Sequence, residues 1–254
     1  MEAKILTLSR SPTPTTLTSA HWKLKRKPAY PHVVGVLTRP ADDTTEETRK
    51  TNVYKDNWFD RLAINHLSKN VQETSGFINS KSGFESLVEA ATVVFQKFNN
   101  PVQQQEVIIQ SLDRAFPRPI LSLIRTVMPP SQLAREYFAA FTTLFFAWLV
   151  GHCEVRESKV NGRREKNVVH IKKCRFLEET NCVGMCINLC KMPCQSFIKD
   201  SLGMPVNMVP NFDDMSCEMI FGEDPPALTD DPALKQPCYK LCTVKKKHGM
   251  KCLN

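Results

Sequence analysis

The sequence lacks the motifs that mark several common protein classes. Its 9 glycines in 254 residues include no glycine-rich phosphate-binding loop, and no serine nucleophile elbow is present. There is no internal repeat, which excludes a repeat architecture. The longest apolar run, residues 137–150, would reach about 21 Å as a helix, which is short of a bilayer core of about 30 Å. We therefore expect neither a P-loop enzyme, nor an α/β-hydrolase, nor a membrane-spanning helix in this run.

Negative charge is scarce at the N-terminus, and most of the net charge of +8 is concentrated there. Residues 1–40 hold seven Lys or Arg against Glu2 alone, so the remaining 214 residues carry only +2. Attraction to a phosphate backbone requires basic groups gathered on a folded surface. We therefore expect no nucleic-acid partner.

Residues 1–40 also lack the continuous apolar core of a secretory signal. They contain nine Ser or Thr and scattered prolines, a composition typical of an organellar transit peptide, with a disordered tail as the alternative. Residues 41–51 reverse the charge and lack large apolar side chains, as a linker does. We expect a plastid or mitochondrial transit peptide over 1–40, a linker over 41–51 and a single folded domain over 52–254.

The folded part is predicted to be mainly α-helical. Apolar periodicity predicts a helix capped by Asp56, a second one ending near Asn99, a third from Pro101 to about Phe116, and a short fourth before Pro129. Ser131 is expected to cap a fifth helix that contains the apolar run 137–150. A helix apolar on every side either forms the central core or faces an apolar ligand.

A β-hairpin is predicted at Asn161-Gly162, because both residues tolerate the positive φ of a tight turn. Residues 153–175 hold eight Lys or Arg against three Glu, as in a solvated surface or a contact with anionic lipid headgroups. Residues 177–202 are predicted to be helical, and loops with one short helix near Cys217 are expected after Gly203. The predicted fold is a compact helical domain with a small hairpin and a cysteine-rich region, 174–242.

Ten cysteines are present, and four of them repeat at one interval. This thiol series comprises Cys182, Cys186, Cys190 and Cys194, which stack on one face because four residues are close to one helical turn. Each four-residue step rotates the next thiol by about 40° around the helix axis, so four thiols on a straight helix cannot bind one metal centre. Two neighbouring thiols, about 6 Å apart, can bind the same centre. Pro193 is expected to kink or break the helix, which would bring the pairs together.

Metal binding, redox disulfides and core packing are the three interpretations of these thiols, and an organellar chain of this length favours metal. Three residues lie between neighbouring cysteines, whereas zinc sites more often have two. This spacing favours iron, as an ion or as an iron–sulfur cluster, over structural zinc. Cys153, Cys174 and Cys252 are interpreted as buried small hydrophobes. The histidines have no paired spacing. The candidate ligands are Cys182, Cys186, Cys190, Cys194, Cys238 and Cys242.

Residues 53–62, V-Y-K-D-N-W-F-D-R-L, and the segment from C-V-G-M-C-I-N-L-C-K-M-P-C to C-E-M-I-F-G resemble the plant plastid β-carotene isomerases of the Dwarf27 family. The resemblance covers roughly residues 53–243. It implies an iron-containing enzyme of the chloroplast stroma that interconverts all-trans- and 9-cis-β-carotene at the first step of strigolactone biosynthesis. The composition of residues 1–40 agrees with a plastid. The resemblance assigns no catalytic residue.

β-Carotene is a hydrocarbon about 30 Å long, so binding it requires a tunnel or an apolar groove reachable from a membrane. The candidate substrate-binding residues are Phe141, Phe145 and Trp148, and the basic hairpin and C-terminal tail would provide peripheral contact with the plastid membrane. Rotation about the double bond requires either electron exchange with iron or protonation by Glu178, Glu179, Asp213 or Asp214. A non-catalytic iron–sulfur electron carrier and a zinc-stabilised interaction module are the alternatives.

Overall fold

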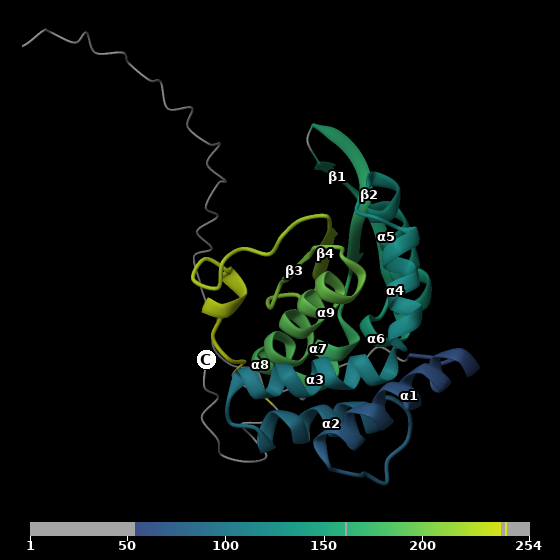
Figure 1. Ribbon diagram of the computed structural model, residues 1–254. Helices are drawn as coiled ribbons and strands as arrows, with labels where there is room; N and C mark the ends of the chain where they lie inside the picture. Colours follow the sequence, from purple (N-terminus) through teal and green to yellow (C-terminus); the bar gives the residue numbers. More distant parts are fainter. Residues whose placement is uncertain (1–53, 161, 240–241, 243–254) are drawn as a thin grey trace, which may run out of the picture. The chain divides into compact units, whose positions relative to one another are not determined.

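The computed structural model describes residues 54–160, 162–239 and 242, which all belong to one unit of the chain (Figure 1). Helices dominate this unit and a small antiparallel sheet completes it, which confirms the predicted fold class. The expected transit peptide, the linker, Cys252 and the basic C-terminal tail lie outside the described residues.

The first three helices pack against one another, and their bounds confirm the sequence signals. They are α1 (Trp58–Ser75), α2 (Gly83–Lys97) and α3 (Pro101–Ala115). Pro101 begins α3, where its missing N–H would have had no helical partner. The predicted cap of α1 is wrong by one residue. Asn57 accepts from the Asp60 amide and forms a capping box with Asp60, while the Asp56 carboxylate accepts hydrogen bonds from Arg175.

The apolar run 137–150 forms two helices instead of one. α4 (Arg118–Val127) precedes α5 (Gln132–Phe145), and α6 (Ala147–Val150) follows after Phe146, whose ψ of 7° leaves the helical region. Ser131 caps α5 as predicted. α5 packs on the sheet through Phe138, whereas Leu144 is exposed, so the run is half-buried and is not a central core helix. Among the described residues no helix is long and apolar enough to cross a bilayer.

The sheet has four antiparallel strands in the order β1-β2-β4-β3. β1 (Cys153–Val160) and β2 (Arg163–Ile171) are the predicted hairpin, with Gly162 at a φ of 81°. β3 (Val206–Pro210) and β4 (Cys217–Phe221) lie where loops and a short helix were predicted, and that prediction is wrong. Alternate residues of β4 are buried because the strand places one face of the sheet on the core.

The cysteine-rich segment is helical as predicted, but it is divided into several short pieces. α7 (Arg175–Thr180) stops at Asn181, whose φ is 44°, and α8 (Val183–Met185) follows. Next come the π-helical turn η1 (Cys186–Lys191) and α9 (Met192–Leu202). A kink or break was predicted at Pro193, but the chain stays helical there. Pro193 lies in the first turn of α9, directly after the π-turn, where the Met192 amide donates to the Ile187 carbonyl five residues back. α9 then packs against α3, α4 and β3, and the short 3-10 helix η2 (Pro232–Lys235) lies near the end of the described chain.

Candidate functional site

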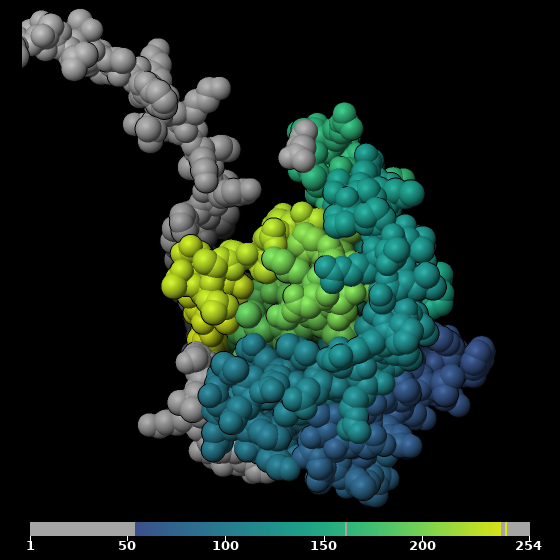
Figure 2. All heavy atoms as spheres, viewed as in Figure 1, coloured from purple at the N-terminus to yellow at the C-terminus, as the bar shows by residue number. Residues whose placement is uncertain are grey.

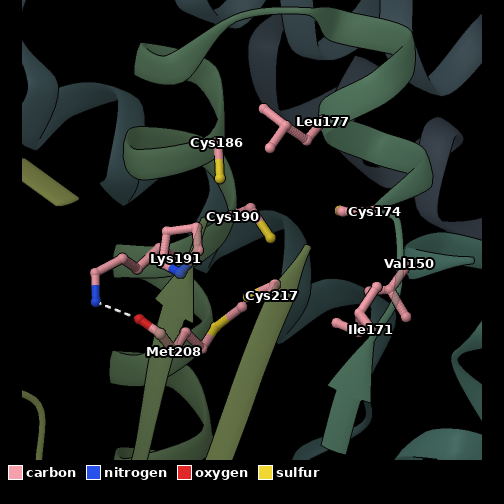
Figure 3. A pocket seen from close by; sticks show the side chains of 10 residues that line it. Val150, Ile171, Cys174, Leu177, Cys186, Cys190, Lys191, Met208 and Cys217 are labelled. Carbon is pink, nitrogen blue, oxygen red and sulfur yellow. Dashed lines mark hydrogen bonds between the residues drawn. The ribbon is translucent and has the colours of Figure 1, made fainter. Parts of the chain in front are cut away.

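Four thiols lie around one small apolar cavity beside the sheet (Figure 3). Cys186 and Cys190 come from the π-turn η1, Cys174 caps the N-terminus of α7, and Cys217 is the first residue of β4. We name these residues the thiol quartet. Apolar side chains make most of the remaining wall: Val150, Ile171, Leu177, Met208 and Pro210. The quartet exists because three elements that are separate in sequence meet at this point.

Burial keeps the quartet thiols protonated. It raises the pKa of Cys174 to about 12, and the neighbouring Cys190 adds to that shift. Burial also raises the pKa values of Cys186 and Cys217 well above the ordinary value, while the charge of Lys191 opposes the shift. The pKa of Cys190 rises chiefly through its hydrogen bond with Cys194. Thiolate formation here therefore requires a positive charge, which a bound cation supplies.

Lys191 is the charged residue among the described residues that line the cavity, and it is only 1% exposed. Its Nζ donates to the Met208 carbonyl at 2.5 Å and to Gln195 Oε1 at 3.2 Å, and it pairs with Asp231 Oδ2 at 2.9 Å. These three acceptors together engage all three N–H donors of the Lys191 ammonium group. Asp231 balances most of this charge, so Lys191 opposes only a small part of the rise in the pKa values of Cys186 and Cys217.

The quartet supplies the type of ligand, thiolate sulfur, that iron–sulfur clusters use. Within the described part of the chain, no three His, Cys, Asp or Glu side chains converge closely enough to hold one metal ion. Four soft thiols around a common space are nevertheless the ligand type of an iron–sulfur cluster. The cavity has room for about one water-sized group, so a cluster would enter only if the lining moved apart.

The structure brings together two of the six predicted ligands, Cys186 and Cys190. Cys194 contacts Cys190 from the first turn of α9. The other three do not line the cavity: Cys182 is buried at the N-cap of α8, Cys238 is half-buried and Cys242 is buried on the C-terminal segment. Their binding of metal stays a prediction.

Sequence reasoning missed two members of the quartet. Cys174 was interpreted as core packing, and Cys217 was placed near a short helix. The alternation of Cys217, Met219 and Phe221 with less buried residues is a strand pattern that could have placed Cys217 on an inward face. No comparable local signal marks Cys174, because only the tertiary fold brings it to the cavity.

The predicted substrate-binding residues lie at two depths. Phe141 and Phe145 stack at the surface of α5, with ring centroids 4.5 Å apart. Trp148 is buried, and its ring lies 6.3 Å from that of Phe146. α6 carries Trp148 and ends at Val150 in the cavity wall, so this short helix connects the aromatic surface with the thiol quartet.

Of the four candidate acids, only Glu178 is buried. Its carboxylate pairs with Lys173 at 2.7 Å and accepts from the Tyr54 hydroxyl at 3.1 Å. Glu179 and Asp213 are exposed, and the hydrogen bond from Ser216 lowers the pKa of Asp214, which makes Asp214 a poor proton donor. Glu178 is thus the remaining candidate for a proton-transfer route.

Comparisons with known proteins define the family of this chain. The chain is 73% identical over 256 residues to "Beta-carotene isomerase D27, chloroplastic" of Medicago truncatula, and the match covers 100% of both chains. The chain belongs to the D27 β-carotene isomerase family. A D27 protein of the same name from Arabidopsis thaliana is 50% identical over 89% of this chain and 85% of its own.

The family model described as "Beta-carotene isomerase D27-like, C-terminal" matches residues 148–230. This D27-like region contains Trp148, the whole thiol quartet and the entire thiol series, whereas Cys238 and Cys242 lie beyond it. No solved structure matches the chain.

Proposed function

We propose that this chain is a plastid isomerase that uses iron to interconvert all-trans- and 9-cis-β-carotene. The isomerase activity follows from membership of the D27 family and from full-length similarity to the Medicago relative. The thiol quartet is the single observation that supports iron dependence, since three buried thiols and one partly buried thiol around a common space are the ligand type of an iron–sulfur centre. The proposed ligands are Cys174, Cys186, Cys190 and Cys217.

The proposal extends to the cellular context. Residues 1–40 would direct the protein to the chloroplast stroma and be removed there, and the reaction would be the first step of strigolactone biosynthesis. The word "chloroplastic" in the names of both relatives supports the compartment. A fluorescent reporter fused to residues 1–51 should enter plastids, and a reporter that stays in the cytosol would contradict the assignment.

The residues of the chain perform distinct tasks in this mechanism. A bound iron centre would supply reversible one-electron exchange with the polyene, which would lower the order of the double bond that rotates. The quartet would hold the centre, and Lys191, already paired with Asp231, would offset only part of the negative charge of the thiolates. Val150, Ile171 and Leu177 keep water away from the thiols that they surround. Glu178 is already engaged by Lys173 and Tyr54, which favours the electron route over protonation.

Matched cysteine variants test the proposed function. All-trans-β-carotene is incubated anaerobically with wild type, Cys217→Ala and Cys153→Ala, and 9-cis product and iron per chain are measured. Cys153 lies outside the cavity wall and serves as the control. Cys217→Ala should lose iron and at least tenfold in turnover, whereas Cys153→Ala should retain both. Full turnover by iron-free Cys217→Ala would overturn the iron proposal, and no conversion by iron-loaded wild type would overturn the isomerase proposal.

A readout independent of activity comes from thermal unfolding. The cavity has room for about one water-sized group, so a cluster must displace its lining and form new bonds to the thiols. Anaerobic reconstitution with iron and sulfide should therefore raise the Tm of wild type but not of Cys217→Ala. Equal shifts in both proteins would mean that the iron binds elsewhere.

A further inference from the structure

α4 has an apolar stripe that is wider than its contact with the protein. Leu121 is buried and Ile124 is partly buried against the core. Beside them lies a second row with the i, i+3, i+7 spacing of one helical face: Ile120 is 54% exposed, Leu123 63% and Val127 68%. This row has no packing partner among the described residues that accounts for its apolar character.

α5 repeats the same feature. Its inner face, including Phe138 and Ala139, packs toward the sheet. Its outer face carries Leu133, Tyr137 and Leu144, which follow the i, i+4, i+11 spacing of one line along a helix and are 74%, 48% and 73% exposed. A surface helix normally places polar residues on that side, so an apolar outer face indicates an interaction surface.

A chain of aromatic rings joins α5 to the start of α1. Ring centroids lie 5.9 Å apart from Tyr137 to Phe141, 4.5 Å from Phe141 to Phe145, 6.1 Å from Phe145 to Phe59 and 6.1 Å from Phe59 to Trp58. Trp58 is 77% exposed at the end of this chain. The outer face of α5 is therefore continuous with an exposed indole ring on α1.

Ring contacts also connect α5 with the start of α4. Phe141 lies 6.0 Å from Phe146, and Phe146 lies 6.3 Å from Phe116, two residues before α4 begins. Figure 1 shows α4 and α5 along the same flank of the described unit, and Figure 2 shows their teal atoms on that flank. We name the exposed apolar residues of these three helices the apolar face: Trp58, Ile120, Leu123, Val127, Leu133, Tyr137, Leu144 and Phe145.

The charges on and beside α4 are mostly positive. α4 contains Arg118 and Arg125 and no acidic residue, and Arg114 precedes it. The Arg118 side chain is 82% exposed and pairs with Asp113 at 3.6 Å, so three basic residues stand against one carboxylate here. A symmetric pair of chains would place these basic residues opposite one another, which opposes dimerisation through this face. Anionic lipid headgroups complement the same charges.

We propose that the apolar face docks on the surface of a lipid bilayer. α4 then lies in the interface with its apolar stripe toward the acyl chains, and Trp58 and Tyr137 occupy the headgroup level that amphipathic aromatic rings favour. The basic residues of α4 attract anionic headgroups. The bilayer contact thus assigns a role to exposed apolar side chains on three helices.

The link to catalysis rests on the proposed function. β-Carotene is a hydrocarbon that dissolves in the bilayer interior, so a docked face meets the substrate where it resides. Phe145 belongs to the face and Val150 to the cavity wall, and only five residue steps, which include the turn at Phe146, separate them along the chain. Docking therefore brings the lipid phase close to the thiol quartet.

Vesicle flotation tests the docking with matched variants. The probe is a vesicle of neutral galactolipid with a fixed minority of phosphatidylglycerol. The face variant carries Leu123→Gln, Val127→Gln and Leu144→Gln. The control carries Ile78→Gln, Val102→Gln and Leu228→Gln, three residues of similar exposure (85%, 66% and 63%) that lie outside the apolar face. The face variant should lose at least tenfold in vesicle partitioning, and the control should bind as wild type does.

A second readout separates docking from catalysis. With β-carotene in detergent micelles, the face variant should turn over at the wild-type rate, while with β-carotene in vesicles its rate should fall in step with its partitioning. Wild type that floats with vesicles but isomerises nothing would leave docking supported and the proposed function rejected. Vesicle binding by the face variant equal to wild type would overturn the docking proposal. So would wild type that does not bind vesicles and instead sediments as a dimer that the face variant dissociates.

Discussion

Lys191 and Asp231 form an ion pair whose two side chains are 2% and 4% exposed. Removal of one partner leaves the other charge buried without compensation, which typically costs about 3–5 kcal/mol. Lys191→Met should therefore lower the free energy of unfolding by that amount in urea denaturation. Lys191→Met combined with Asp231→Leu should recover much of the loss, because no lone charge remains.

The exposed pair Lys199–Asp224 is the matched control for this prediction. Its N···O distance of 2.7 Å is similar, but its side chains are 56% and 67% exposed. Solvent screening makes such pairs weak, so Lys199→Met should leave the free energy of unfolding nearly unchanged. Equal effects of Lys191→Met and Lys199→Met would contradict the argument from burial.

A second ion pair makes stability depend on pH. Arg135 donates hydrogen bonds of 2.7 and 2.8 Å to Glu165, and these lower the pKa of the Glu165 carboxyl from its ordinary 4.5. The folded state thus binds this proton more weakly than the unfolded state, so the stabilisation is present at neutral pH and is lost as pH falls through the folded-state pKa.

Denaturation of wild type and Glu165→Gln from pH 7 to about pH 3 checks this sign. The difference in free energy of unfolding between the two proteins should be largest at neutral pH and should shrink as the solution becomes acidic. A difference that stays constant or grows toward low pH would show that the pair does not control the titration.

At the scale of elements, the turn after β4 depends on a glycine. Gly222 has a φ of 89°, and a Cβ placed there would lie 2.0 Å from Arg135 Cδ. Gly83 also has a positive φ, 62°, but no atom lies within 4 Å of its Cβ position. Gly83→Ala should cost about 1 kcal/mol from backbone strain alone. Gly222→Ala should cost clearly more, because Arg135 must also move away from Glu165.

Parallel urea denaturation of the two alanine variants measures this difference. If Arg135 has moved away from Glu165 in Gly222→Ala, the ion pair no longer stabilises that variant. Adding Glu165→Gln to Gly222→Ala should therefore lower the free energy of unfolding by less than Glu165→Gln does in wild type. If Gly222→Ala and Gly83→Ala lowered the free energy of unfolding equally, Arg135 would be able to move away from the new Cβ without loss of stability, which would contradict this prediction.

Local signals determined most helices, and tertiary contacts determined the rest. Pro101 and Ser131 begin helices for reasons that their own backbone and side chains contain, so the sequence predicted both starts. β3 and β4 were missed because turn-forming residues surround two five-residue strands whose hydrogen bonds come from one another and from β2. The π-turn was missed because the four-residue spacing of the cysteines matches an α-helix.

In the candidate site, the sequence predicted the residues that share one helical segment but not those that come from other elements. Cys186 and Cys190 lie within one helical segment, and their spacing alone indicated that they act together. Cys174 and Cys217 reach the cavity from other elements, so only the fold relates them to the π-turn. Phe141 and Phe145 were predicted to bind substrate, which stays a prediction, and the sequence could not tell that one side of α5 stays exposed.

At the scale of the whole described unit, three features lie one behind the other from the surface to the interior. The apolar face meets the solvent, Phe146 and Trp148 carry aromatic contacts inward, and α6 ends at the thiol cavity. This order suits a hydrocarbon that enters from a bilayer and reacts in the dry interior of the protein. The activity proposed for this D27 member therefore depends on the quartet at the inner end of that route.

The iron content of two anaerobically purified double variants tests this central claim most directly. Cys174→Ser with Cys217→Ser removes only quartet residues, whereas Cys182→Ser with Cys194→Ser removes only residues of the thiol series outside the quartet. The account predicts that the first variant contains almost no iron and that the second retains the wild-type amount per chain. Iron retained by the first variant and lost from the second would contradict it.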